Sequence, residues 1–211
     1  MKSDLPYVPS SNAAIGFRVH SGWAAFVVMS LDESEPRVLA RGRPHLVETF
    51  TYRFRQPYHT AETMPLDEAC AFISNIEKEA SRFAQEIVRS VRTDLQRQGY
   101  ELRRFALIRA SGKPLPGLEK ILSSHALIHT ADGELFRTAL AYAARHYRLA
   151  EFSPKENEMI DSAAKTLGLQ AKNLMLQLTA LGRHLGPPWS QDEKFAALAA
   201  WLALCTESQQ S

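Results

Sequence analysis

Hydrophobic residues follow a strand period at the start of the chain. Residues 13–20 alternate between apolar and small or polar side chains, Ser21-Gly22 predicts a tight turn, and residues 25–29 are almost wholly apolar. Residues 37–43 predict a third strand, and residues 46–50 are its candidate continuation after a proline, which is tolerated only at an edge or a bulge. Three strands joined by short turns predict an antiparallel meander.

The apolar period then becomes helical. Residues 57–65 predict a loop, and apolar residues at three- and four-residue steps predict one long amphipathic helix over residues 66–98. Gly99 is its predicted C-cap. Residues 101–110 predict a fourth strand and residues 149–153 a short fifth one. Further helices are predicted over residues 117–124, 132–147, 155–167, 170–184 and 191–206.

This order of elements predicts an α/β fold with a mixed five-stranded sheet covered by helices. Three antiparallel strands are followed by two parallel ones, and right-handed crossovers place strands four and five beside strand one. Extra helices follow at the carboxyl end. This order resembles that of the ribonuclease H-like fold. We expect one such domain over residues 13–206, with a flexible tail at residues 1–12 and a frayed end at residues 207–211.

The amino-acid composition indicates the size of the core and the cellular compartment more clearly than the function. With 211 residues, 45% of them hydrophobic, the chain can bury a sizeable core, and a net charge of +2 neither demands nor excludes a polyanionic partner. Cys70 and Cys205 lie in apolar helical contexts and are predicted to be buried, reduced thiols. No segment resembles a signal peptide, and no apolar run approaches the roughly 20 residues of a membrane span. We therefore expect a cytoplasmic protein without a membrane partner.

Three short motifs resemble the Holliday-junction resolvase branch of the ribonuclease H-like superfamily. Residues 15–18, followed by residues 21–24, resemble its opening Ile-Gly-Ile-Asp and later Gly-Trp-Ala. Residues 149–156 resemble its fifth strand and the Tyr-Ser-Pro-Arg/Lys-Glu start of the next helix. Residues 192–200 resemble its last helix, in which an acidic residue precedes a small apolar run. The order and spacing of the motifs carry the resemblance, since each motif is short.

The resemblance implies phosphodiester cleavage by two metal ions held by three or four carboxylates. However, the first-strand Asp of the family falls on Arg18, which would repel a cation, and the fourth-strand acid falls around residues 109–111, where no carboxylate stands. Of the family's acidic positions, only the one in the last helix still carries a carboxylate in this sequence, as Asp192 or Glu193. We therefore predict a degenerate metal site in a protein with a binding or scaffolding role. An actin-like ATPase is disfavoured, because residues 19–22 are the lone candidate for a phosphate-binding turn.

A hydrolase with a rebuilt site of histidines and carboxylates is the alternative. His125 and His129 have the i, i+4 spacing of one helical face, and Glu134 follows, so the three are candidate ligands of a transition metal such as Zn²⁺. If the helix instead starts near Thr130, the two histidines precede it and serve as capping groups. A divalent metal ion is the candidate cofactor.

His20, Asp192 and Glu134 are the candidate catalytic residues of that alternative, because imidazole can act as acid and base near neutral pH. Since strands one and four are neighbours in this fold, we expect His20, Asp192 and the segment 125–134 to converge on one cleft. A stabilising Arg18–Asp192 pair in an inactive site is the competing interpretation.

Nucleic acid is the candidate partner. The candidate binding residues are Arg18, Arg109 and Lys113 at the same cleft, together with Arg137 and Lys155. A second basic group is either a nucleic-acid-binding face or an ordinary solvated surface. It consists of Arg89, Arg92, Arg97, Arg103 and Arg104.

Overall fold

The computed structural model describes residues 11–109 and 114–206. Most of the predicted tail, the predicted frayed end and the candidate Lys113 lie outside these ranges. Residues 11 and 12 were expected to belong to the tail but begin the first strand. Within the described ranges, no helix combines the length and the hydropathy that a membrane span requires.

The predicted mixed sheet is confirmed. Its strands are β1 (Ser11–His20), β2 (Trp23–Asp32), β3 (Glu35–Gly42), β4 (Tyr100–Leu107) and β5 (Ala150–Phe152). They lie in the order β3-β2-β1-β4-β5. β1 is antiparallel to β2 and parallel to β4, which in turn is parallel to β5. The two later strands therefore extend the sheet on the β1 side, with β4 next to β1 and β5 beyond β4, as right-handed crossovers predict.

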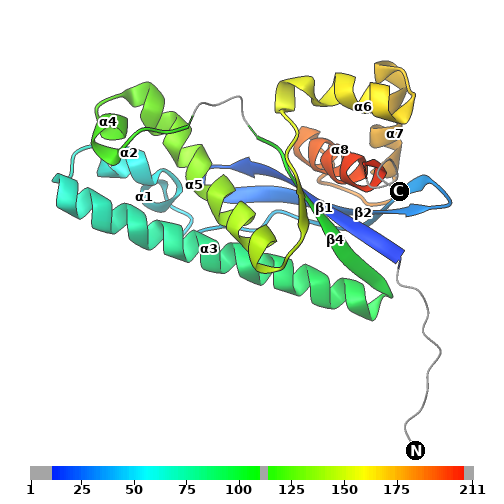
Figure 1. Cartoon of the computed structure of the whole chain (residues 1–211), viewed down its shortest axis with the longest axis horizontal. Coiled ribbons are helices and arrows are strands. Elements are labelled where there is room, and N and C mark those ends of the chain that lie inside the picture. Colours follow the sequence, from blue (N-terminus) through cyan, green and yellow to red (C-terminus); the bar gives the residue numbers. More distant parts are fainter. Residues whose placement is uncertain (1–10, 110–113, 207–211) are drawn as a thin grey trace, which may run out of the picture.

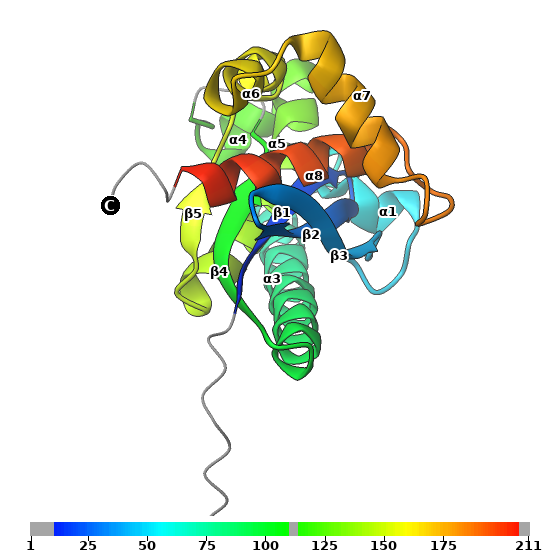
Figure 2. The same ribbon diagram turned by 90° about the vertical axis from the view of Figure 1, so that its right-hand side faces the viewer.

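Helices cover both faces of this sheet. They are α1 (Tyr52–Arg55), α2 (Pro57–Ala61), α3 (Leu66–Arg97), α4 (Leu118–Leu122), α5 (His125–His146), the 3₁₀ helix η1 (Glu156–Glu158), α6 (Met159–Leu167), α7 (Ala171–Leu181) and α8 (Gln191–Cys205). The helices α3 and α5 pack on one face, and α6, α7 and α8 lie on the other (Figure 1). In Figure 2, α8 crosses above β1 and β2 while α3 runs below them.

Alternation along β1 assigns its residues to the two faces. Ile15 and Phe17 are fully buried in the core formed with α3 and α5, whereas Ala14 is buried in the core formed with α8. Because side chains alternate along a strand, Arg18 and His20 face α8 as well. Gly16 lies on that same face, where the alanine-rich α8 passes directly over the strand backbone.

The structure corrects four local predictions. Residues 57–61, predicted as a loop, form α2, which starts at a proline, and α5 begins at His125 rather than near residue 132. Residues 46–50 do not continue β3, because beyond Pro44 the pairing with β2 is reduced to a single antiparallel bridge between His45 and Trp23. Cys70 is exposed on α3 rather than buried, and Cys205 is half-buried.

Candidate functional site

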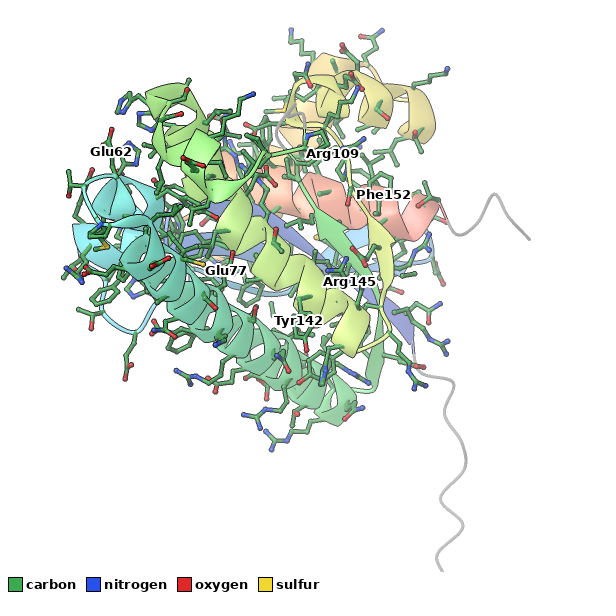
Figure 3. The ribbon with its side chains drawn as sticks, turned by 60° about the vertical axis from the view of Figure 1, so that its left-hand side comes forward. Glu62, Glu77, Arg109, Tyr142, Arg145 and Phe152 are labelled. Atoms are coloured by element: carbon green, nitrogen blue, oxygen red, sulfur yellow. The ribbon has the colours of Figure 1, made fainter. Side chains whose placement is uncertain are left out.

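The carboxyl ends of β1, β4 and β5 meet at one edge of the sheet, because these strands are parallel. Arg18 lies near the end of β1, Arg109 follows β4, and Lys155 follows β5. A backbone bridge pairs Arg109 with Lys155 beyond the ends of their strands. Figure 3 shows Arg109 at the end of β4, between α5 and the helices of the opposite face. The amino end of α8 completes this edge.

Arg18 lies at the centre of the site. Its Nη1 donates to Asp192 Oδ1 and its Nη2 to Glu156 Oε1, each at 2.6 Å. Its guanidinium also lies 5.2 Å from the centre of the Phe195 ring, within the range of a cation–π contact. Burial opposes the charge of Arg18, but the two carboxylates outweigh it and raise its pKa above the ordinary value. The guanidinium is therefore a permanent cation held between two acidic side chains.

Asp192 accepts hydrogen bonds from more than one basic side chain. His20 Nε2 lies 2.9 Å from Asp192 Oδ1, and Arg43 Nη2 lies 3.5 Å from Asp192 Oδ2. The imidazole of His20 is stacked on Trp23, with 4.3 Å between ring centres. Its side chain is 34% exposed, so solvent reaches it. An imidazole–carboxylate pair of this kind can move protons.

Local sequence places Asp192 and Glu193 in the first turn of α8. Ser190 is the N-cap, and Glu193 accepts its backbone N–H, forming a capping box. Glu193 is buried and accepts hydrogen bonds from Arg43 at 2.5 and 2.9 Å. Burial alone would raise the pKa of Glu193, but the bonds from Arg43 and Ser190 lower it to about 2. Glu193 is therefore an ionised structural anchor of the helix start.

These residues do not fit the divalent-cation site that the resemblance implies. A metal ion between Asp192 and Glu156 would have to occupy the position of the Arg18 guanidinium. The nearby carboxylate of Glu193 is turned toward Arg43 and Ser190. Two cationic groups thus already neutralise the acids that a hard cation would need as ligands.

Sequence reasoning placed Arg18, His20 and Asp192 together, and the structure brings them into contact. It missed Glu156 and Arg43. Glu156 closes the motif at residues 149–156, so the resemblance contained a signal for it. Arg43 had no such signal, because its role depends on how β3 ends beside α8.

The predicted site residues of α5 lie on the opposite face of the sheet. His125 and His129 are on α5, which packs with α3, and the described residues show no hydrogen bond or ion pair that joins them to Arg18 or Asp192. Glu134 lies farther along α5 and is paired with Arg137 at 2.7 Å. The single cleft expected from the sequence is therefore two separate groups, because α5 and α8 cover opposite faces.

The second basic group is also divided. Arg104 faces α8 and donates to the carbonyl of Ala203, whereas Arg92 stacks on Tyr147 beside α3. Arg97 and Arg103 form exposed ion pairs with acidic neighbours in sequence. Their surroundings are those of a solvated surface rather than of one continuous basic face.

Comparisons with known proteins found likenesses in structure but not in sequence. No protein-family model and no curated protein sequence matches the chain. A Thermus thermophilus RuvC structure in complex with a Holliday junction substrate matches with a TM-score of 0.53 and 10% identity, over 93% of this chain and 95% of that one. Another Thermus thermophilus RuvC structure matches with a TM-score of 0.53 and 9% identity, over 94% of this chain and 96% of that one.

The yeast mitochondrial Holliday junction resolvase matches with a TM-score of 0.51 and 13% identity, over 98% of this chain and 82% of the other. These likenesses span nearly the whole chain, and they agree with the strand order β3-β2-β1-β4-β5. The chain therefore has a ribonuclease H-like fold.

Proposed function

We propose that this protein binds branched nucleic acid at the carboxyl edge of its sheet and does not cut it. The observation that carries the proposal is the position of Arg18 between Asp192 and Glu156, at 2.6 Å from each. Phosphodiester cleavage in this fold class needs carboxylates free to hold cations. Here the guanidinium of Arg18 neutralises both carboxylates, so they stabilise the fold and do not hold a metal ion.

Two basic residues at the edge support nucleic acid as the ligand. Arg109 is exposed, and among the described residues the bonds found for it involve its backbone and not its guanidinium. Lys155 is paired with Glu158 at 2.7 Å, but both side chains are exposed, and such pairs contribute little. Both cations are therefore available to phosphate groups, and one structural neighbour is a resolvase in complex with a Holliday junction.

Replacing Arg109 with alanine is expected to weaken binding of a four-way DNA junction about three- to tenfold, because one phosphate contact is lost. Fluorescence anisotropy over a series of salt concentrations measures it. The affinity of the native protein for the junction should fall steeply as the salt concentration rises. In the variant, the slope of the logarithm of the binding constant against the logarithm of the salt concentration should be smaller by about one. Arg37→Ala is the matched control, since Arg37 is exposed at the opposite end of the sheet. An equal loss in both variants, or no salt-dependent binding of the native protein, would contradict the proposal.

A metal-dependent hydrolase is the second candidate. It is favoured by His59 of α2 and by His125 and His129 of α5, whose ring nitrogens lie within 4.8 Å of one another. Cleavage that survives Asp192→Ala but is lost in His129→Ala would support this candidate over a purely binding role.

A further inference from the structure

We infer that His59, His125 and His129 form a binding site for a transition-metal ion, with Zn²⁺ as the ion that their chemistry fits. One ring nitrogen from each residue lies within 4.8 Å of the other two. Within the described ranges, no other group of three or more histidine, cysteine or acidic side chains comes as close. The site lies on α2 and α5, at the corner of the molecule that the Glu62 label marks in Figure 3.

The start of α5 aligns two of the ligands. Because the helix begins at His125, that residue and His129 stand one turn apart on the same side. Their Nε2 atoms are 3.1 Å apart. Two nitrogens bound tetrahedrally at the usual Zn–N length of about 2.0–2.1 Å lie about 3.3 Å apart, so the pair needs almost no movement to share an ion.

A buried carboxylate orients the third ligand. Nδ1 of His59 is hydrogen-bonded to Asp132, which is 2% exposed and also accepts the backbone N–H of Tyr58 at 2.7 Å. With Nδ1 donating to Asp132, Nε2 of His59 is left with its lone pair. Metal-binding histidines commonly donate their second nitrogen to a carboxylate in this way, which fixes the ring and makes it a better ligand.

Ligand type and exposure define the kind of ion and site. Three neutral imidazoles suit Zn²⁺ and its neighbours, whereas Mg²⁺ and Ca²⁺ require oxygen ligands. His59 is held by the protein, but His125 and His129 are exposed. A metal there would have three protein ligands and one side open to water, the arrangement of a reactive rather than a closed structural zinc site.

Metal titration of the untagged protein, freed of metal by a chelator and then dialysed, tests the site. We expect one equivalent of Zn²⁺ to bind in competition with a chromophoric chelator and to raise the melting temperature of the protein. Mg²⁺ should leave the melting temperature unchanged. His125→Ala and His129→Ala should each lower the affinity for Zn²⁺ at least 100-fold. Because both side chains are exposed, these variants should keep the native circular dichroism spectrum.

Asp132→Asn tests the orienting role and should lower the affinity for Zn²⁺ about 10- to 100-fold. His184→Ala is the control, since His184 is exposed and lies outside the cluster. Binding of less than one equivalent, or an equal loss in His184→Ala and His129→Ala, would overturn the inference and leave the three rings as a packing cluster. The result is independent of nucleic-acid binding, so failure of either proposal leaves the other standing.

Discussion

Replacing Gly16 with alanine is expected to lower the free energy of unfolding by about 3 kcal/mol or more, the upper range of overpacking effects. A β-carbon at Gly16 would lie 2.0 Å from the carbonyl oxygen of Ala196 and 2.9 Å from the amide nitrogen of Ala200. Both are backbone atoms of α8, so no side-chain rotation can relieve the clash. The whole helix would have to move away from β1, and with it Asp192 at its first turn.

Urea denaturation followed by circular dichroism measures this effect. Gly117→Ala is the matched control, because a β-carbon there meets no atom within 4 Å and the backbone φ of −62° suits alanine. We expect the control to change stability by less than about 1 kcal/mol, the cost of losing glycine at a helix start. If Gly16→Ala were as stable as Gly117→Ala, the close approach of α8 to β1 would be refuted.

Replacing Arg18 with aspartate is expected to make the stability of the protein depend on a divalent metal. Without metal, three carboxylates would face one another where two now share a guanidinium, at a cost of about 3 kcal/mol. Mg²⁺ or Mn²⁺ should then restore the melting temperature, because binding to the folded state alone stabilises it. The melting temperature of the native protein should not rise in this way with Mg²⁺ or Mn²⁺, because Arg18 occupies the space between the two carboxylates.

Arg18→Asn separates the two parts of this effect. Asparagine removes the ion pairs without adding a carboxylate, so we expect lower stability and no recovery with Mn²⁺. Thermal melts of the three proteins with and without Mn²⁺ measure it. An Arg18→Asp variant as stable as the native protein without metal, or an identical Mn²⁺ response in both variants, would count against the idea that Arg18 replaces a cation.

The sheet could be predicted because its strands carry a clear period. Residues 13–20 alternate and residues 66–98 follow a helical step, and the structure has β1 and α3 there. The helix at residues 57–61 was missed because five residues are too few to show a period. The start of α5 was placed too late because Thr130 resembles an N-cap, whereas its hydroxyl bonds back to the carbonyl of Ala126 inside the helix.

The candidate site was predictable as far as strand order determines contacts. Arg18 and Asp192 were matched because β1 and the last helix meet in this fold, and they lie 2.6 Å apart. His59 could not be matched with His125, because their contact depends on how a short, unpredicted helix packs against α5. Arg43 likewise depends on where β3 ends. Pairs far apart in sequence without a periodic signal become visible only in the folded chain.

Incubation of the purified protein with a labelled four-way DNA junction in Mg²⁺ or Mn²⁺, analysed on native and denaturing gels, addresses the central proposal that Arg18 has replaced the metal of this fold. We predict that the junction is bound on the native gel and remains uncut on the denaturing gel at saturating protein. Metal-dependent cleavage that disappears in Asp192→Ala would contradict it, because Asp192 would then be holding a catalytic cation rather than Arg18.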